Sequence, residues 1–224
     1  MGKRRNRADR CALCRLHVGL CICASLPRID TRTRVVLVLH RTEDRRSTNT
    51  GRIAASCLRR SQIVVRGDVD APADDLGLDH AGTEPLLLYP HDDAAVLERR
   101  PEGAPPVTLV VPDGNWRQAG KVRARVRGLA SLRAVRLPDG PPSRYRLRRW
   151  SHAHGLSTLE AIARAIDVLE GGVARAELER VLDALVERTL WVKGALRDDE
   201  VQGGLPEGAM RHAPSAVAPP IRRP

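Results

Sequence analysis

Short apolar runs that alternate with helical segments constrain the fold of this chain more than any other feature. The runs are rich in Val, Leu and Ile and are bounded by turn or charged residues, which is typical of strands buried on both faces. They cover residues 35–40, 62–65, 86–90, 107–111 and 132–137. Helical segments are expected at residues 50–60, 92–100 and 115–126. This alternation predicts an α/β fold, with a mostly parallel sheet covered by helices on both faces.

The last third of the chain is expected to be helical. A capping box starts the first helix, with Ser157 as the N-cap and Glu160 three residues later. Apolar residues then recur at helical spacing until Gly171 provides a stop. A second amphipathic helix is predicted over residues 173–196. Residues 198–224 are rich in Gly, Pro and Ala, so they are predicted to form a disordered tail.

Four of the five cysteines form a C-x2-C-x6-C-x-C pattern near the N-terminus. They are Cys11, Cys14, Cys21 and Cys23. Zn²⁺ prefers four soft ligands at tetrahedral corners, and two close cysteine pairs supply them at little cost in loop-closure entropy. We therefore predict one structural zinc in a small unit, residues 1–33, that begins with a basic arm. A redox CxxC or a disulfide pair is a weaker interpretation, because no thioredoxin-like pattern surrounds the motif.

His17 and Cys57 are two further residues of a type that can bind metal. His17 can replace one cysteine as a ligand, although four cysteines already saturate a tetrahedral site. Cys57 stands alone in a helical segment and is interpreted as a small core residue. The cysteines do not resemble a secreted disulfide framework, and no apolar run has the length of a signal peptide or a membrane span. We therefore expect a cytoplasmic protein without a membrane segment.

The charge balance favours a polyanionic partner. The chain has 38 Lys and Arg residues against 27 Asp and Glu residues, a formal net charge of +11. Most of the excess is Arg, whose planar guanidinium suits phosphate, so nucleic acid, acidic lipid or an acidic protein are the candidate partners. With two Tyr, three Trp and no Phe, an aromatic platform for repeated base stacking is not expected. Motifs for nucleoside triphosphate hydrolysis, zinc proteolysis and serine hydrolysis are missing from the sequence.

Three stretches of the predicted α/β domain, residues 34–197, carry polar residues suited to chemistry. Residues 40–52, "HRTEDRRSTNTGR", taken alone resemble a solvated loop with a helix N-cap. In "PDGNW" at 112–116, Asp113 follows a buried strand, where ligands of α/β proteins gather, although a turn and a cap also explain it. Residues 141–160 join an Arg-rich run to the capped helix, which fits either a solvated loop or a patch for RNA phosphates.

Taken in order, these stretches resemble one family. The cysteine pattern, H-x2-E-x3-S-T-N-T-G, a strand ending in D-x-x-W-x-x-A-x-K, S-x-Y-x-x-R-R and L-S-T-x-E are similar to the DTW-domain proteins. The resemblance covers residues 10–195. It departs from the family at Asn115, which stands where Thr is usual. Asn retains a hydrogen-bonding group and remains a good N-cap, so the turn is expected to survive.

The resemblance implies a fold and a reaction. The fold is that of the SPOUT class of α/β RNA-modifying enzymes, with a trefoil knot. The reaction transfers the 3-amino-3-carboxypropyl group of S-adenosylmethionine to N3 of a tRNA uridine and releases 5′-methylthioadenosine. Asp113 is then expected to accept the N3 proton or to hold the cation of the donor. Trp116 is expected to pack on the uracil or the adenine, unless it is an ordinary core residue at a helix start.

The resemblance also implies a donor pocket and a tRNA-binding surface. The pocket combines strand ends with a helix start, whose backbone N–H groups suit a polar ligand. Its expected residues are Leu88, Tyr89, Pro112, Asp113, Leu156, Ser157 and Thr158. The expected tRNA contacts, some of which can hold the donor carboxylate instead, are Arg117, Lys121, Arg144, Arg146, Arg148 and Arg149. A methyltransferase of the same fold and a non-catalytic zinc-containing RNA-binding protein stay open as alternatives.

Overall fold

A parallel sheet of six strands forms the centre of the protein. The structure, a computed structural model, describes residues 9–44, 46, 48–67, 76–78, 82–114, 116–147 and 155–211, without the side chains of Trp116 and Arg117. The strands are β1 (Arg34–His40), β2 (Ser61–Arg66), β3 (Glu84–Leu88), β4 (Ala95–Val96), β5 (Val107–Asp113) and β6 (Arg133–Arg136). Their order is β2-β1-β5-β3-β6-β4, and every pair of neighbours is parallel. The predicted α/β fold is therefore confirmed.

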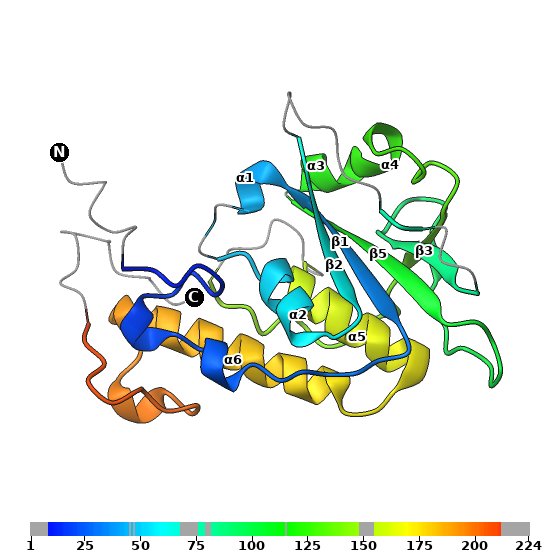
Figure 1. Cartoon of the computed structure of the whole chain (residues 1–224). Helices are drawn as coiled ribbons and strands as arrows, with labels where there is room; N and C mark the ends of the chain where they lie inside the picture. Colours follow the sequence, from blue (N-terminus) through cyan, green and yellow to red (C-terminus); the bar gives the residue numbers. More distant parts are fainter. Residues whose placement is uncertain are drawn as a thin grey trace.

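Helices lie on both faces of this sheet (Figure 1). They are α1 (Arg41–Asp44), α2 (Gly51–Cys57), α3 (Trp116–Gly120), α4 (Val122–Arg125), α5 (Thr158–Glu170) and α6 (Ala174–Val192). Val35, Leu37 and Leu39 of β1 join a large core with α2, α5 and α6, whereas Val36 and Val38 join a smaller core with α4. Because β1 is buried on both faces, its sequence is continuously apolar rather than alternating.

Two predicted helices differ from the structure. Residues 92–100 contain the short strand β4, which pairs with β6, and the N–H of Leu97 donates to the carbonyl of Arg136. The prediction of a helix there is wrong, because pairing with a neighbouring strand overrides the helical propensity of Ala and Leu. The predicted helix at 115–126 is divided at Lys121 into α3 and α4. Gly120, which disfavours a helix interior by about 1 kcal/mol, ends α3.

The C-terminal helices start and stop largely as predicted. The capping box of α5 is confirmed, and Gly171 ends the helix with a left-handed φ of 69°. Residues 198–211 differ from the predicted tail, because the indole of Trp191 donates to Asp198 and Val201 is buried. A 3-10 helix, η3 (Asp198–Glu200), starts this segment. Residues 212–224 lie outside the described residues.

The cysteine-rich segment packs along α6 (Figure 1). It contains two short 3-10 helices, η1 (Val18–Leu20) and η2 (Cys23–Ser25). Leu16, Leu20 and Ile22 belong to the large core, and Arg188 of α6 donates to the carbonyls of Leu20 and Cys21. The segment therefore shares a core with the α/β domain. Among the described helices, none has both the length and the apolar character that a bilayer crossing requires. The trefoil knot stays a prediction.

Candidate active site

The carboxylate of Asp113 lies at the carboxyl edge of the sheet. Asp113 is the last residue of β5, is 6% exposed, and lies beside Leu39 of β1. Because the strands are parallel, the ends of β1, β2, β3 and β6 meet at the same edge, where ligands of α/β proteins bind. Asn49 Nδ2 donates to Oδ2 at 2.6 Å, and Thr158 Oγ1 donates to Oδ1 at 2.8 Å. Each carboxylate oxygen is thus held by a different sequence motif.

Asn49 is itself fixed by the helix that follows it. Its Oδ1 accepts from the backbone N–H of Arg52 at 2.9 Å, in the first turn of α2, as a helix-capping side chain does. The amide nitrogen therefore points toward Asp113. Asn49 is 7% exposed, so the interpretation of residues 40–52 as a solvated loop is wrong at this position. Two signals in the sequence indicated this residue, namely its place as a candidate helix N-cap and the motif S-T-N-T-G.

Gly51 allows the two arms of this arrangement to approach. A Cβ atom at this position would lie 2.5 Å from Asp113 Oδ2, 3.0 Å from Leu37 Cδ1 and 3.1 Å from Thr158 Cγ2. Real Cβ atoms do not approach a neighbour to 2.5 Å, so any larger residue must displace the carboxylate. The glycine is required here by close packing around Asp113.

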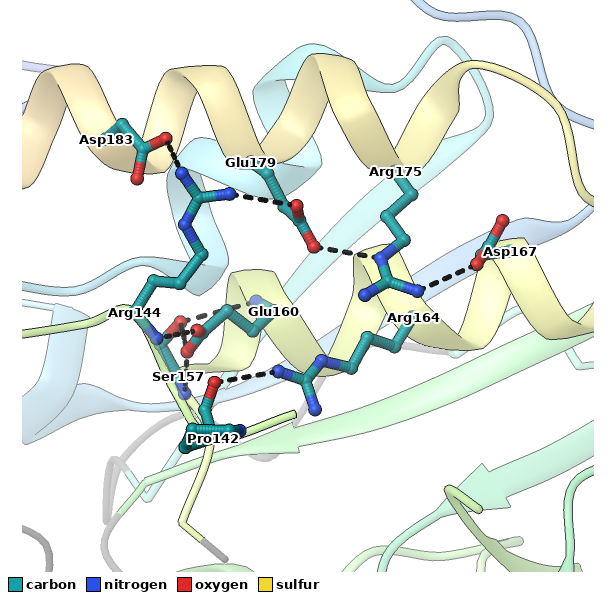
Figure 2. Close-up of polar contacts among 9 residues, drawn as sticks. All are labelled: Pro142, Arg144, Ser157, Glu160, Arg164, Asp167, Arg175, Glu179 and Asp183. Atoms are coloured by element: carbon teal, nitrogen blue, oxygen red, sulfur yellow. Dashed lines mark hydrogen bonds and ion pairs between the residues drawn. The ribbon is translucent and has the colours of Figure 1, made fainter. Parts of the chain in front are cut away.

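The start of α5 is tied to the preceding loop by Glu160. This carboxylate is 1% exposed and accepts from Ser143 Oγ and from the backbone N–H of Arg144, both at 2.7 Å. It also accepts from the backbone N–H and the hydroxyl of Ser157, at 2.9 and 2.8 Å (Figure 2). A buried carboxylate requires hydrogen-bond donors. Here the preceding loop supplies two of them, and the N-cap residue of α5 supplies the other two.

The four N-terminal cysteines converge on one point. Their Sγ atoms lie within 4.8 Å of one another, with Cys11–Cys23 at 3.4 Å and Cys14–Cys21 at 3.7 Å. A tetrahedral zinc with Zn–S bonds of about 2.3 Å places its sulfurs roughly 3.8 Å apart. The cluster therefore has the ligand type and the spacing for a metal ion such as zinc.

His17 and Cys57, the two other residues of a metal-ligating type considered above, have different structural roles. The Nδ1 atom of His17 accepts from the backbone N–H of Gly19 at 3.2 Å, at the start of η1. Cys57 is fully buried, and its burial raises the pKa of the thiol to about 12. It is the core residue that its isolated position predicted.

The comparison with known families covers most of the residues described above. The DTW domain family matches residues 8–190, a span that contains the cysteine cluster, Asn49, Asp113 and Thr158. The chain belongs to the DTW-domain family. Three positions define the D-x-x-W part of the family motif. Asp113 ends β5, Asn115 lies outside the described residues, and Trp116 starts α3.

Three curated relatives of this chain share one name, tRNA-uridine aminocarboxypropyltransferase 2. The protein from Drosophila melanogaster is 33% identical over 183 residues, which cover 79% of this chain and 72% of the relative. The proteins from Macaca fascicularis and Mus musculus are 28% and 29% identical over 189 residues, or 80% of this chain. The match spans 63% of the length of each of these two relatives. No solved structure matches the chain.

A second polar cluster of this DTW domain lies at the same edge of the sheet. The Nδ1 atom of His40, at the end of β1, accepts from the backbone N–H of Thr42 and lies 3.2 Å from Gln118 Nε2. Arg66, at the end of β2, donates to the carbonyl of Gln118 at 2.6 Å. Burial lowers the pKa of His40, and the charges of Arg66 and Arg41 lower it further, so the neutral ring is favoured. His40 begins the motif H-x2-E-x3-S-T-N-T-G, whereas Arg66 and Gln118 were not among the residues that the sequence indicated.

The residues expected to line a donor pocket reach the same edge from three elements. Leu88 ends β3 and is buried, while Tyr89 is half-buried, and burial raises the pKa of its hydroxyl. Pro112 lies in β5 beside Val38 of β1. From α5, Thr158 contacts Asp113 directly. Leu156 and Ser157 directly precede Thr158 in the chain. Leu156 is half-buried, and the hydroxyl of Ser157 takes part in the capping box.

The residues expected to bind tRNA have different surroundings. Lys121 and Arg146 are exposed. The guanidinium of Arg144 is instead held by Glu179, at 3.2 Å, and by Asp183, both on α6 (Figure 2). Burial raises the pKa of the Asp183 carboxyl, although the nearby Arg144 opposes this shift. Arg148, Arg149 and the side chain of Arg117 lie outside the described part of the chain.

Proposed function

We propose that this protein transfers the 3-amino-3-carboxypropyl group of S-adenosylmethionine to N3 of a uridine in tRNA and releases 5′-methylthioadenosine. The observation that carries the proposal is the double hold on Asp113, by Asn49 and Thr158, at the ligand-binding edge of the sheet. Membership of the DTW-domain family and the names of the three relatives support the same reaction.

The proposed reaction needs a base or a counter-charge, and Asp113 is suited to both. The uridine loses its N3 proton, and N3 attacks the Cγ carbon of the donor. The C–S bond breaks as the N3–Cγ bond forms, and its electron pair stays on sulfur in neutral methylthioadenosine. Asp113 either accepts the N3 proton or holds the sulfonium cation.

The donor is proposed to lie against the ends of β3 and β5 and the start of α5. Its pocket comprises Leu88, Tyr89, Pro112, Leu156, Ser157 and Thr158. These residues reach the edge that holds Asp113, and orientation of the donor there decides whether Cγ or the methyl group meets the base. Trp116, at the start of α3, is proposed to pack against the uracil or the adenine.

The tRNA is proposed to bind through basic side chains around this edge. They are Arg117, Lys121, Arg146, Arg148 and Arg149. Their support is the charge density of the segment and the exposure of Lys121 and Arg146. Arg144 is proposed to belong to the same surface, because its side chain is 53% exposed even though Glu179 and Asp183 pair with its guanidinium.

A structural zinc is proposed to bind to Cys11, Cys14, Cys21 and Cys23. The spacing of their Sγ atoms supports a tetrahedral ion, and four thiolates leave no open position for catalysis. The proposed location is the cytoplasm, where a reducing environment keeps thiols free.

Nucleoside mass spectrometry of tRNA tests the proposed reaction. Unmodified tRNA is incubated with the purified protein and S-adenosylmethionine, digested and analysed. The expected product is a uridine that carries the aminocarboxypropyl group on its base. A methylated nucleoside would instead identify a methyltransferase of the same fold. RNA binding without S-adenosylmethionine binding, measured by calorimetry, would identify a non-catalytic RNA-binding protein.

Gly51→Ala is expected to reduce turnover about 100-fold, because its Cβ atom would displace the Asp113 carboxylate. Displacing a reacting group by about 1 Å costs on the order of 10²-fold in rate. The matched control is Gly203→Ala, whose Cβ would find only an ordinary contact with Ala184, at 3.8 Å. Steady-state kinetics of both variants provides the measurement. Equal turnover in the two variants would show that the packing around Asp113 is irrelevant to the reaction.

The double variant Arg148→Ala, Arg149→Ala is expected to weaken tRNA binding and its dependence on salt. Each lost phosphate contact flattens the slope of log K against log salt by roughly 0.7 to 0.9. The control Arg60→Ala, Arg180→Ala removes the same charge from residues paired with Asp30 and Glu177. Binding titrations at salt concentrations between about 50 and 200 mM compare the tRNA affinity and its salt slope in the two double variants. Wild-type affinity and slope in the first variant would contradict the assignment.

A further inference from the structure

We infer that the segment Ser143–Arg144–Tyr145, between β6 and α5, positions the Asp113 carboxylate, and that Tyr145 and Glu160 are its positioning residues. The inference rests on the proposed function only for what the carboxylate does to a substrate. Neither residue was among the candidates for the site. They act through the two side chains that hold Asp113, and each of them reaches one of those side chains.

Tyr145 supports the arm that carries Asn49. Tyr145 is 2% exposed, and its hydroxyl donates to the carbonyl of Thr48 at 2.8 Å. Thr48 directly precedes Asn49, whose Nδ2 lies 2.6 Å from Asp113 Oδ2. The hydroxyl of Tyr145 therefore fixes the backbone from which the Asn49 side chain projects.

Glu160 supports the arm that carries Thr158. It binds the backbone N–H and the hydroxyl of Ser157, and the next residue, Thr158, donates to Asp113 Oδ1 at 2.8 Å. The same carboxylate binds Ser143 Oγ and the backbone N–H of Arg144. One buried acceptor therefore joins the segment to the helix start that holds the opposite oxygen of Asp113.

The segment is also anchored away from the site, by α6. Arg144 pairs with Glu179 and Asp183, and Glu179 in turn pairs with Arg175 at 2.9 Å (Figure 2). Arg175 continues to Asp167 of α5 at 3.0 Å. The two arms of Asp113 are thus connected, through one short segment, to the helix pair beneath the sheet. Arg144 therefore pairs with carboxylates of α6 while its side chain stays 53% exposed.

Tyr145→Phe tests the inference, because it removes one oxygen atom and leaves the buried ring in place. The expected result is a kcat about tenfold lower, with KM for tRNA and for S-adenosylmethionine within about twofold of the wild-type values. Glu160→Gln is expected to lower kcat further, because its amide group presents N–H donors to groups that are already donors.

Thr108→Val is the matched control for lost hydroxyl bonding. Thr108 is fully buried in β5, at the opposite end of the strand from Asp113, and its hydroxyl lies 3.1 Å from Thr83 Oγ1. It is expected to lower the thermal midpoint comparably, with kcat unchanged. An equal loss of kcat in Thr108→Val and Tyr145→Phe would overturn the inference, because stability alone would then explain both.

A nuclear magnetic resonance measurement separates this inference from the proposed function. The side-chain amide resonances of Asn49 report its bond to Asp113 and require no turnover. They are expected to move in Tyr145→Phe and to stay in place in Thr108→Val. The same movement in Tyr145→Phe, together with a wild-type protein that forms no aminocarboxypropyl product, would support the positioning role and contradict the proposed function. Unchanged Asn49 resonances and unchanged kcat in Tyr145→Phe would overturn the inference.

Discussion

Asp113→Asn is expected to reduce turnover about 100-fold or more while the protein still folds and still binds tRNA. Asn keeps the size of the side chain and its preference for turns, but it removes the charge and the proton acceptor. General-base catalysis commonly contributes 10² to 10⁴ in rate, which sets the scale of the loss. Steady-state kinetics, with tRNA affinity and thermal midpoint measured in parallel, provides the test.

The contacts of Asp113 provide the control for this variant. An amide at position 113 can accept from only one of the two donors, Asn49 Nδ2 and Thr158 Oγ1, so a stability loss of about 1 kcal/mol is expected. Thr158→Val removes one donor and keeps the carboxylate, and its turnover is expected to fall less than that of Asp113→Asn. Full activity in Asp113→Asn would leave Asp113 as a turn residue and require another base.

Loss of the metal is expected to have the largest effect on stability. Structural zinc sites stabilise folded peptides by about 10 kcal/mol or more. Even if only part of this energy is coupled to folding, Cys14→Ser is expected to lower the free energy of unfolding by at least about 3 kcal/mol. For a chain of this size that corresponds to a thermal midpoint roughly 10 °C lower. The loss is expected to reach α6, because Leu20 and Ile22 share its core and Arg188 bonds the segment. Metal analysis and thermal unfolding measure the two effects.

Cys57→Ala is the matched cysteine variant. Cys57 is buried in the core and is not one of the four clustered cysteines, and its burial favours the protonated thiol. The variant is expected to retain one zinc per chain, whereas Cys14→Ser is expected to retain much less. Purified wild-type protein with far less than one zinc per chain would contradict the zinc assignment outright.

The fold was predictable where burial leaves a simple pattern in the sequence. The strands β1 and β5 are covered on both faces, and their continuous Val and Leu runs indicate this directly. The two-residue strand β4 has no such pattern, and it was missed because it forms by pairing with β6 at the edge of the sheet. The capping box at Ser157 was predictable because it is a local contact within one helical turn.

The site was predictable only in part. The position of Asp113 after a buried strand indicated a ligand-binding edge, but its partner Asn49 lies 64 residues earlier in the chain. Such a contact depends on the parallel order of β1 and β5, which periodicity does not determine. The interpretation of Arg144 followed charge density along the sequence, whereas its partners Glu179 and Asp183 lie 35 and 39 residues later, on α6.

The by-product formed by the purified protein tests the central claim most directly. The protein is incubated with S-adenosylmethionine and unmodified tRNA, and the small molecules are separated by chromatography. We expect 5′-methylthioadenosine in an amount equal to the modified uridine, and both to form about 100-fold or more slowly in Asp113→Asn. S-adenosylhomocysteine in place of methylthioadenosine would contradict the account, because it would show that the methyl group, and not the Cγ carbon, reaches the base.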